Sequence, residues 1–86
     1  MSIKDSSDFV IKFGSNLRKI RKSKDITQEK LCELSGLALS QVGRIERGEI
    51  NTSLDIVKTI ADALKIDVYL LFKFEYHERS QERIVK

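Results

Sequence analysis

Five residues between positions 39 and 47 have the spacing of one outward helix face. Their side chains are mostly small, polar or basic, and they are Leu39, Ser40, Gly43, Arg44 and Arg47. An arginine guanidinium donates two parallel hydrogen bonds, which match the N7 and O6 acceptors of guanine. A leucine either contacts a thymine methyl group or covers a neighbouring residue. This face therefore has the chemistry to read base edges in a major groove, with Arg44 as its strongest candidate.

Two short amphipathic segments must position this face. Thr27 is a good N-cap for the first segment, and Gly36 can adopt the left-handed conformation that ends it. Gly48 can end the second segment in the same way. We expect the inner faces to consist of Leu31, Leu34, Leu37, Val42 and Ile45, with Cys32 as a small buried hydrophobe.

Hydrophobic periodicity predicts a helix on each side of this pair. The first contains Phe9, Phe13, Leu17 and Ile20, with Ser7 or Asp8 as its cap, and the later one contains Leu54, Val57, Ile60, Ala61 and Leu64. Gly14 costs the first helix about 1 kcal/mol relative to alanine. We interpret Gly14 as a point of close packing against another helix, with a tolerated weak spot as the alternative.

The segment after Lys65 has two interpretations. Asp67 can cap a short fifth helix over Val68–Phe72, followed by an extended tail, and this is the preferred prediction. Alternating β-forming residues over 68–76 favour instead a strand that pairs with a second subunit. The predicted division is a flexible N-terminus at 1–7, a helical domain at 8–72, and a C-terminal tail at 73–86 with a potential role in dimer formation.

Composition supports a small all-α domain. The chain has 86 residues, of which 41% are hydrophobic and 34% charged, with no proline and only four glycines. These values indicate one globular domain that favours helices. The formal net charge is +3, and basic residues are concentrated in the first third of the chain, which suits a polyanionic partner.

Several other classes of protein are disfavoured. A single cysteine and a single histidine provide neither an internal disulfide nor a metal cluster, and we expect no cofactor. His77 lies in a charged tail without a paired nucleophile, so we do not expect an enzyme. The sequence contains no apolar run of signal-peptide or membrane-spanning length, which predicts a cytoplasmic protein with no membrane partner.

Several short motifs together resemble the Cro/C1-type helix-turn-helix proteins of the xenobiotic-response-element family, which includes phage repressors and bacterial regulators. They are Phe13-Gly14, Leu17-Arg18-Lys19-Ile20-Arg21, Thr27-Gln28-Glu29 with Leu31, Ser35-Gly36, Ile45-Glu46-Arg47-Gly48 and Ser53-Leu54. Each motif is weak alone, but their joint spacing is specific and covers roughly residues 13 to 72. The resemblance implies a five-helix, lambda-repressor-like fold whose second and third helices read DNA.

The resemblance also implies roles for individual residues. Gln28 resembles a glutamine that contacts a phosphate and braces the recognition helix. Arg21 and Glu46 match a partly buried pair that joins the first and third helices, although two solvated charges are the alternative. The implied DNA-binding set is Thr27, Gln28, Leu39, Ser40, Gln41, Gly43, Arg44 and Arg47.

One position departs from the family pattern. Ala38 replaces the usual Ser or Thr cap of the recognition helix. Either this helix end is frayed, or Ser40 caps a helix that starts later, which would shift the register in which bases are read.

These observations predict a sequence-specific double-stranded DNA-binding transcriptional regulator, a repressor that binds a palindromic operator as a homodimer. The expected dimer surface consists of Tyr69, Phe72, Phe74 and Tyr76, although these aromatics could instead cover the subunit's own core. An antitoxin or restriction–modification controller of the same fold, with a toxin or other protein partner, is an alternative. A helical interaction module that does not bind DNA is another, and a neutral or acidic recognition face would indicate it.

Overall fold

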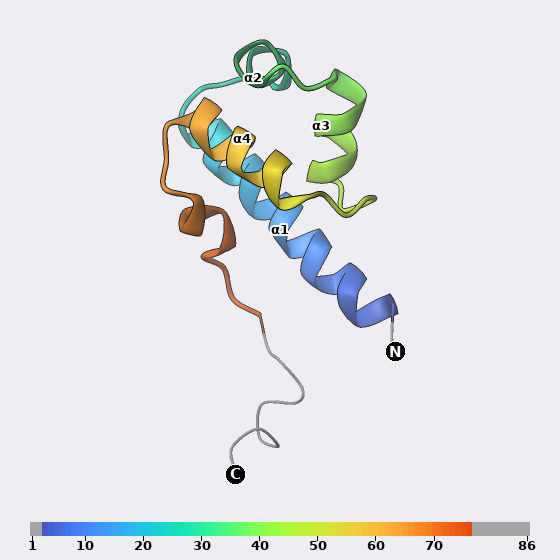
Figure 1. Ribbon diagram of the computed structural model, residues 1–86. Coiled ribbons are helices and arrows are strands. Elements are labelled where there is room, and N and C mark those ends of the chain that lie inside the picture. Colours follow the sequence, from blue (N-terminus) through green and yellow to red (C-terminus); the bar gives the residue numbers. More distant parts are fainter. Residues whose placement is uncertain (1–2, 77–86) are drawn as a thin grey trace.

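The computed structural model describes residues 3–76, with side chains described from residue 8 onward. This part of the chain contains four α-helices and one 3-10 helix (Figure 1). They are α1 (Ile3–Ser23), α2 (Gln28–Ser35), α3 (Leu39–Glu46), α4 (Leu54–Leu64) and η1 (Val68–Phe72). The all-α prediction is confirmed for the described residues, and the predicted fifth helix is a 3-10 helix. His77 and the rest of the predicted tail from 77 to 86 lie outside the described residues.

The helices surround a single core. The long helix α1 packs against α3 and η1, while α4 packs against α2 and η1. Every helix contributes to the core, whose buried hydrophobic residues are Phe13, Leu17, Leu31, Val42, Ile45, Val57, Ile60, Ala61, Leu64 and Leu71. Figure 1 shows α3 at one edge of the molecule and η1 at the opposite edge. The fold therefore leaves one side of α3 uncovered by the other helices.

Local capping explains where the central helices begin and end. The Thr27 hydroxyl accepts a hydrogen bond of 3.0 Å from the Lys30 amide, and the Ser53 hydroxyl accepts one from the Ile56 amide of α4. Gly36 and Gly48 have φ angles of 81° and 73°, which glycine adopts without the steric cost of a Cβ atom. The caps predicted at Thr27, Gly36 and Gly48 are confirmed.

The start of α3 resolves the question raised by Ala38. Ala38 occupies the N-cap position in an extended conformation, and its side chain makes no capping hydrogen bond. The helix nevertheless begins at Leu39, and Ser40 lies inside it. A later start capped by Ser40 is therefore wrong, and the reading register remains the one that the sequence motif implies.

One predicted boundary is wrong. Helix α1 begins at Ile3, so residues 3–7 belong to it, and neither Ser7 nor Asp8 is its N-cap. Residues 3–8 contain no proline or glycine that would stop the helix. The last helix has the predicted bounds, Val68–Phe72, and Asp67 occupies its N-cap position but makes no side-chain capping bond.

The strand predicted as an alternative over 68–76 is also wrong. Val68–Phe72 form a 3-10 helix, and the Asn16 side-chain amide of α1 donates hydrogen bonds to the carbonyl groups of Leu70 and Leu71, at 3.0 and 2.9 Å. These bonds satisfy acceptors at the end of the helix and hold it against α1.

Two leucines assigned to the core lie at the surface. Leu34 on α2 is 48% exposed, and Leu54 at the start of α4 is 81% exposed. Both lie within a turn of a helix end, where the apolar stripe runs past the neighbouring helices. Hydrophobic spacing identifies a helix face correctly but does not show how far along the helix that face is covered.

Gly14 marks the closest approach of two helices. A Cβ atom at this position would collide with the Ile45 carbonyl oxygen and would lie 2.7 Å from that of Glu46. These obstructing atoms belong to the backbone of α3 and cannot rotate away. The predicted close packing is confirmed, and the absence of a side chain lets α1 lie directly against α3.

A buried ion pair joins the same two helices. Arg21 donates from Nε to Glu46 Oε2 at 2.6 Å and from Nη2 to Oε1 at 3.0 Å. Its Nη1 donates to the Ile26 carbonyl oxygen at 2.7 Å, which ties the α1–α2 loop to the pair. Both side chains are buried, so the alternative of two solvated charges is wrong. Hydrogen bonding to Glu46 raises the pKa of Arg21, although burial opposes this shift.

We predict that Gly14→Ala destabilises the domain by about 1–3 kcal/mol or more, because a methyl group must push α1 away from α3. Gly43→Ala is the matched control. Its Cβ atom would meet only the end of the Arg47 side chain, at 3.0 Å, and alanine favours the helix. Thermal unfolding should show a large drop in the midpoint temperature for Gly14→Ala and little or no drop in it for Gly43→Ala. Equal midpoints for the two variants would contradict the close approach.

We predict that Arg21→Met and Glu46→Leu each lower the free energy of unfolding by about 3–5 kcal/mol, because each leaves a buried charge without its partner. The double variant removes both charges and should be more stable than either single variant. Denaturant unfolding of all four proteins measures this coupling. A single variant that unfolds like the unmodified chain, or strictly additive losses, would show that the pair contributes no coupled interaction.

Candidate nucleic-acid interface

The outer face of α3 presents the residue types that the sequence predicts. At about 100° per residue, Leu39, Gly43, Arg47, Ser40 and Arg44 follow one another around an arc of about 140°. Leu39, Ser40, Arg44 and Arg47 are all exposed to solvent. The opposite side of the helix is buried in the core. Together with Arg47, which directly follows it, helix α3 therefore presents a face with two arginines, while its acidic residue, Glu46, is buried.

Two members of the predicted set are less accessible than the rest. Gln41 is half-buried at the edge of the arc. Gly43 is buried because the Arg47 guanidinium lies over it, with Nη1 3.0 Å from the position that a Cβ atom would occupy. Gly43 thus provides room for Arg47 to lie along the helix.

Gln28 braces α3 through the buried pair. It is the first residue of α2, and its Nε2 donates a hydrogen bond of 3.0 Å to Glu46 Oε1. The carboxylate of Glu46 therefore connects α1, α2 and α3 at one point. Thr27 stands immediately before Gln28, and its hydroxyl is engaged by the helix cap. This hydrogen bond is a contact of the kind that the bracing role requires, and the phosphate contact of Gln28 stays a prediction.

A polar hollow of about 380 Å³ lies beside this brace. Arg18, Arg21, Gln28, Glu46 and Arg47 line it. Since Arg21 and Glu46 neutralise each other, the exposed side chains of Arg18 and Arg47 give the hollow its positive charge. A phosphate group has the size and charge to sit at such a site. The sequence showed a basic first helix but did not single out Arg18.

Glu49 is the second residue that sequence reasoning missed. Its carboxylate accepts a hydrogen bond from Arg47 Nε at 2.8 Å and lies 3.9 Å from Arg44 Nε. The hydrogen bond from Arg47 lowers the pKa of Glu49, because it favours the ionised carboxylate. An acidic group thus adjoins both arginines of the outer face.

The aromatic residues predicted for a dimer surface lie on η1 and in the segment that follows it. Tyr69 on η1 is 61% exposed. Phe72, Phe74 and Tyr76 gather around Phe9 of α1, with ring centroids 6.4, 5.4 and 5.1 Å from its ring. Phe74 packs against the core. The structure therefore separates an exposed tyrosine from three aromatics that also cover their own subunit.

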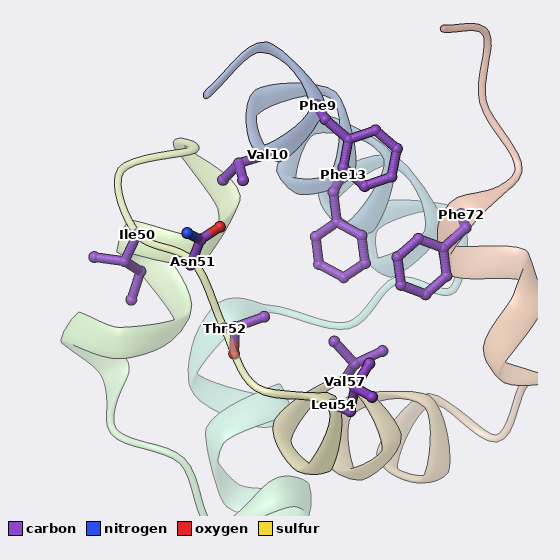
Figure 2. A pocket seen from close by; sticks show the side chains of 9 residues that line it. All are labelled: Phe9, Val10, Phe13, Ile50, Asn51, Thr52, Leu54, Val57 and Phe72. Atoms are coloured by element: carbon purple, nitrogen blue, oxygen red, sulfur yellow. The ribbon is translucent and has the colours of Figure 1, made fainter. Parts of the chain in front are cut away.

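A half-open apolar hollow of about 140 Å³ lies next to these aromatics (Figure 2). Phe9, Phe13 and Phe72 face one another on one side of it, and Val57 and Leu54 of α4 lie below them. With the 81% exposed Leu54 at its rim, this region continues the apolar surface from η1 to the start of α4.

Other kinds of site have little support among residues 8–76. Within these residues there is no group of three or more histidine, cysteine, aspartate or glutamate side chains that could hold a metal ion. Cys32 is half-buried, and desolvation raises the pKa of its thiol, which disfavours the reactive thiolate. None of the described helices combines the length and apolar character needed to cross a membrane.

Comparison with known proteins identifies similar chains. The immunity repressor protein of Bacillus phage phi105 is 30% identical over 82 residues, which cover 85% of this chain and 57% of the repressor. Control protein C.BamHI of Bacillus amyloliquefaciens is 40% identical over 63 residues, covering 72% of this chain and 78% of that protein. This chain thus spans little more than half the length of the phage repressor.

A solved structure is also similar to this chain. The crystal structure of the restriction-modification controller protein C.AhdI from Aeromonas hydrophila aligns with a TM-score of 0.72 and 46% identity, covering 73% of this chain and 96% of that one. A family model described as helix-turn-helix matches residues 17–71, which include α2, α3, their turn and the brace between them. The chain belongs to this helix-turn-helix family.

Proposed function

We propose that this protein is a sequence-specific double-stranded DNA-binding transcriptional regulator that acts as a repressor. The observation that carries the proposal is the uncovered outer face of α3, on which Leu39, Ser40, Arg44 and Arg47 are exposed together. A helix of this size fits the major groove of duplex DNA. The basic character of the face argues against an interaction module that has lost DNA binding. The proposal includes no catalytic activity.

Phosphate contacts would position the domain on DNA. The N-terminus of α2, with Thr27 and Gln28, carries unpaired backbone amides that attract anions. Arg18 and Arg47 flank the polar hollow beside Gln28 and add two positive charges. The N-terminus of α4 offers a second set of amides. Such contacts carry no sequence information but make affinity fall steeply with salt.

Base contacts would provide the specificity. Arg44 has a side chain that is 54% exposed, and its ion pair with Glu49 is longer than a hydrogen bond. Its guanidinium is thus available to donate to guanine N7 and O6. Leu39, which is 47% exposed at the first turn of α3, can contact a thymine methyl group.

A homodimer would supply the length of DNA that one short helix cannot read. The eight residues of α3 reach only a few base pairs, whereas two copies read two half-sites about one DNA turn apart. The exposed apolar surface of Tyr69, Phe72 and Leu54 is the best candidate for the contact between copies. Such a dimer would bind a palindromic operator.

Control of a restriction–modification system is the narrower candidate function. The C.AhdI controller, at 46% identity, is matched over 96% of its length, and C.BamHI is also a control protein. The alternative of an antitoxin, with a toxin as partner, gains no support from the segment 68–76, because a 3-10 helix occupies most of it in place of a strand that could pair with a partner. A regulator of this kind would work in the cytoplasm, where its DNA is found.

The test begins with selection of binding sites from a random duplex pool by the full chain. We expect enrichment of a palindrome with two half-sites and an affinity that falls with salt. In the same selection, Arg44→Ala should lose preference at one base position in each half-site, because a bidentate guanine contact discriminates by about 1–3 kcal/mol. Its thermal midpoint should match that of the unmodified chain, since the side chain is exposed. Failure to enrich any sequence would refute the proposal.

The dimer is tested by sedimentation equilibrium. We expect Tyr69→Glu to weaken self-association by about tenfold or more, because it places a charge in an apolar contact. Leu34→Glu is the matched control, since Leu34 is also apolar and 48% exposed but lies on α2. A chain that stays monomeric at high concentration, with or without Tyr69→Glu, would mean that the aromatics only cover their own subunit.

A further inference from the structure

The turn that ends α3 places Glu49 beside the arginines of the outer face. The Glu49 amide donates to the Arg44 carbonyl oxygen at 2.9 Å, and the Gly48 amide donates to the Ile45 carbonyl oxygen at 3.0 Å. With Gly48 at a φ of 73°, these bonds form a Schellman turn that fixes the backbone of Glu49 relative to α3. The position of the carboxylate is thus built into the way the helix ends.

Glu49 contacts the two arginines in different ways. Arg47 donates to it twice, from Nε to Oε2 at 2.8 Å and from Nη2 to Oε1 at 3.3 Å. Arg44 approaches it only through Nε, at 3.9 Å, which is an ion pair without a hydrogen bond. Arg47 is therefore engaged by a two-pronged contact, while the donors of Arg44 remain available.

A carboxylate that accepts two parallel hydrogen bonds uses the same donors that an arginine presents to phosphate. All three side chains are about half exposed, so DNA can reach them and displace Glu49. Exposed ion pairs exchange readily because water and salt screen them. Glu49 therefore competes with the DNA backbone for Arg47 without blocking it.

We propose that Glu49 is a specificity-determining residue that suppresses non-specific binding by occupying the phosphate-binding donors of Arg47 while leaving Arg44 able to read a base. This inference rests on the DNA-binding function proposed above. Non-specific binding depends almost wholly on phosphate contacts, whereas binding to a cognate site also gains from base contacts. In a non-specific complex Arg47 leaves Glu49 for a phosphate, whereas in the specific complex the base contact of Arg44 fixes the position of α3 and Arg47 stays on Glu49. Competition for Arg47 therefore weakens non-specific complexes by a larger factor than specific ones.

The pKa of Glu49 is lowered, which shows that the contact with Arg47 favours the ionised carboxylate. The hydrogen bond from Arg47 is the main cause of the shift. Because this hydrogen bond comes from Arg47, the effect of Glu49 on DNA affinity depends on Arg47 in particular. This dependence distinguishes it from general repulsion between a surface acid and DNA.

The experiment compares the full chain with Glu49→Gln on two duplexes of equal length, the selected site and a scrambled one, at several salt concentrations. We expect Glu49→Gln to bind the scrambled duplex roughly threefold to tenfold more tightly and the selected site with a smaller gain. The ratio of the two affinities should then fall. The salt dependence on the scrambled duplex should steepen by about one phosphate contact, or roughly 0.9 in the slope of log K against log salt.

Asp62→Asn is the matched control. Asp62 accepts a hydrogen bond of 2.7 Å from Lys58 on the surface of α4, so this change also removes one acid from an exposed ion pair. Because Asp62 lies near the end of α4 that is remote from its N-terminus, the affinity ratio and salt slope should stay as in the unmodified chain. A change equal to that of Glu49→Gln would overturn the proposal, because net charge alone would then explain both.

The double variant Arg47→Gln/Glu49→Gln tests whether Glu49 acts through Arg47. In an Arg47→Gln background, Glu49→Gln should no longer raise affinity for the scrambled duplex, and an undiminished rise would overturn the mechanism. If the unmodified chain selects a site but Glu49→Gln leaves both ratio and slope unchanged, the inference about Glu49 fails and the DNA-binding function stands. If the unmodified chain does not distinguish the duplexes at all, the proposed function itself fails.

Discussion

The contact between α1 and α3 is the constraint on which the rest of this structure depends. Gly14 lets the two backbones meet, and the Arg21–Glu46 pair connects the same helices about two turns further along α1. A close backbone approach alone would allow α3 to rotate about its axis, whereas a buried bidentate pair with a third bond to Gln28 fixes that rotation. The direction in which the outer face points follows from this combination.

Two glutamates near the end of α3 show how burial decides the role of a charge. Glu46 is buried, so its bonds to Arg21 and Gln28 are necessary to offset desolvation, and they make the site rigid. Glu49 is half exposed three residues later, where its bonds to Arg47 are weak enough to exchange with another anion. The buried arginine–glutamate pair therefore holds α3 in position, whereas the exposed pair leaves Arg47 able to exchange Glu49 for another anion.

Features determined by local chemistry could be predicted from the sequence. The cap at Thr27, the left-handed glycines and the inner face with Val42 and Ile45 all follow from rules that act within one or two turns. The close packing at Gly14 could be predicted because a glycine inside a helix needs a reason, and the Arg21–Glu46 pair because the family resemblance implied it. The exposure of Leu34 and Leu54 depends on where neighbouring helices stop, and the place of Glu49 depends on a turn geometry, so neither could be predicted from periodicity.

The segment that follows α4 shows why a period-two pattern gave the wrong alternative. Its alternation between apolar and polar residues suits a strand only if a neighbouring strand accepts its backbone hydrogen bonds. Here the amide of Asn16 binds the carbonyl groups of η1 instead, and this contact holds η1 against α1 at the edge opposite α3 (Figure 1).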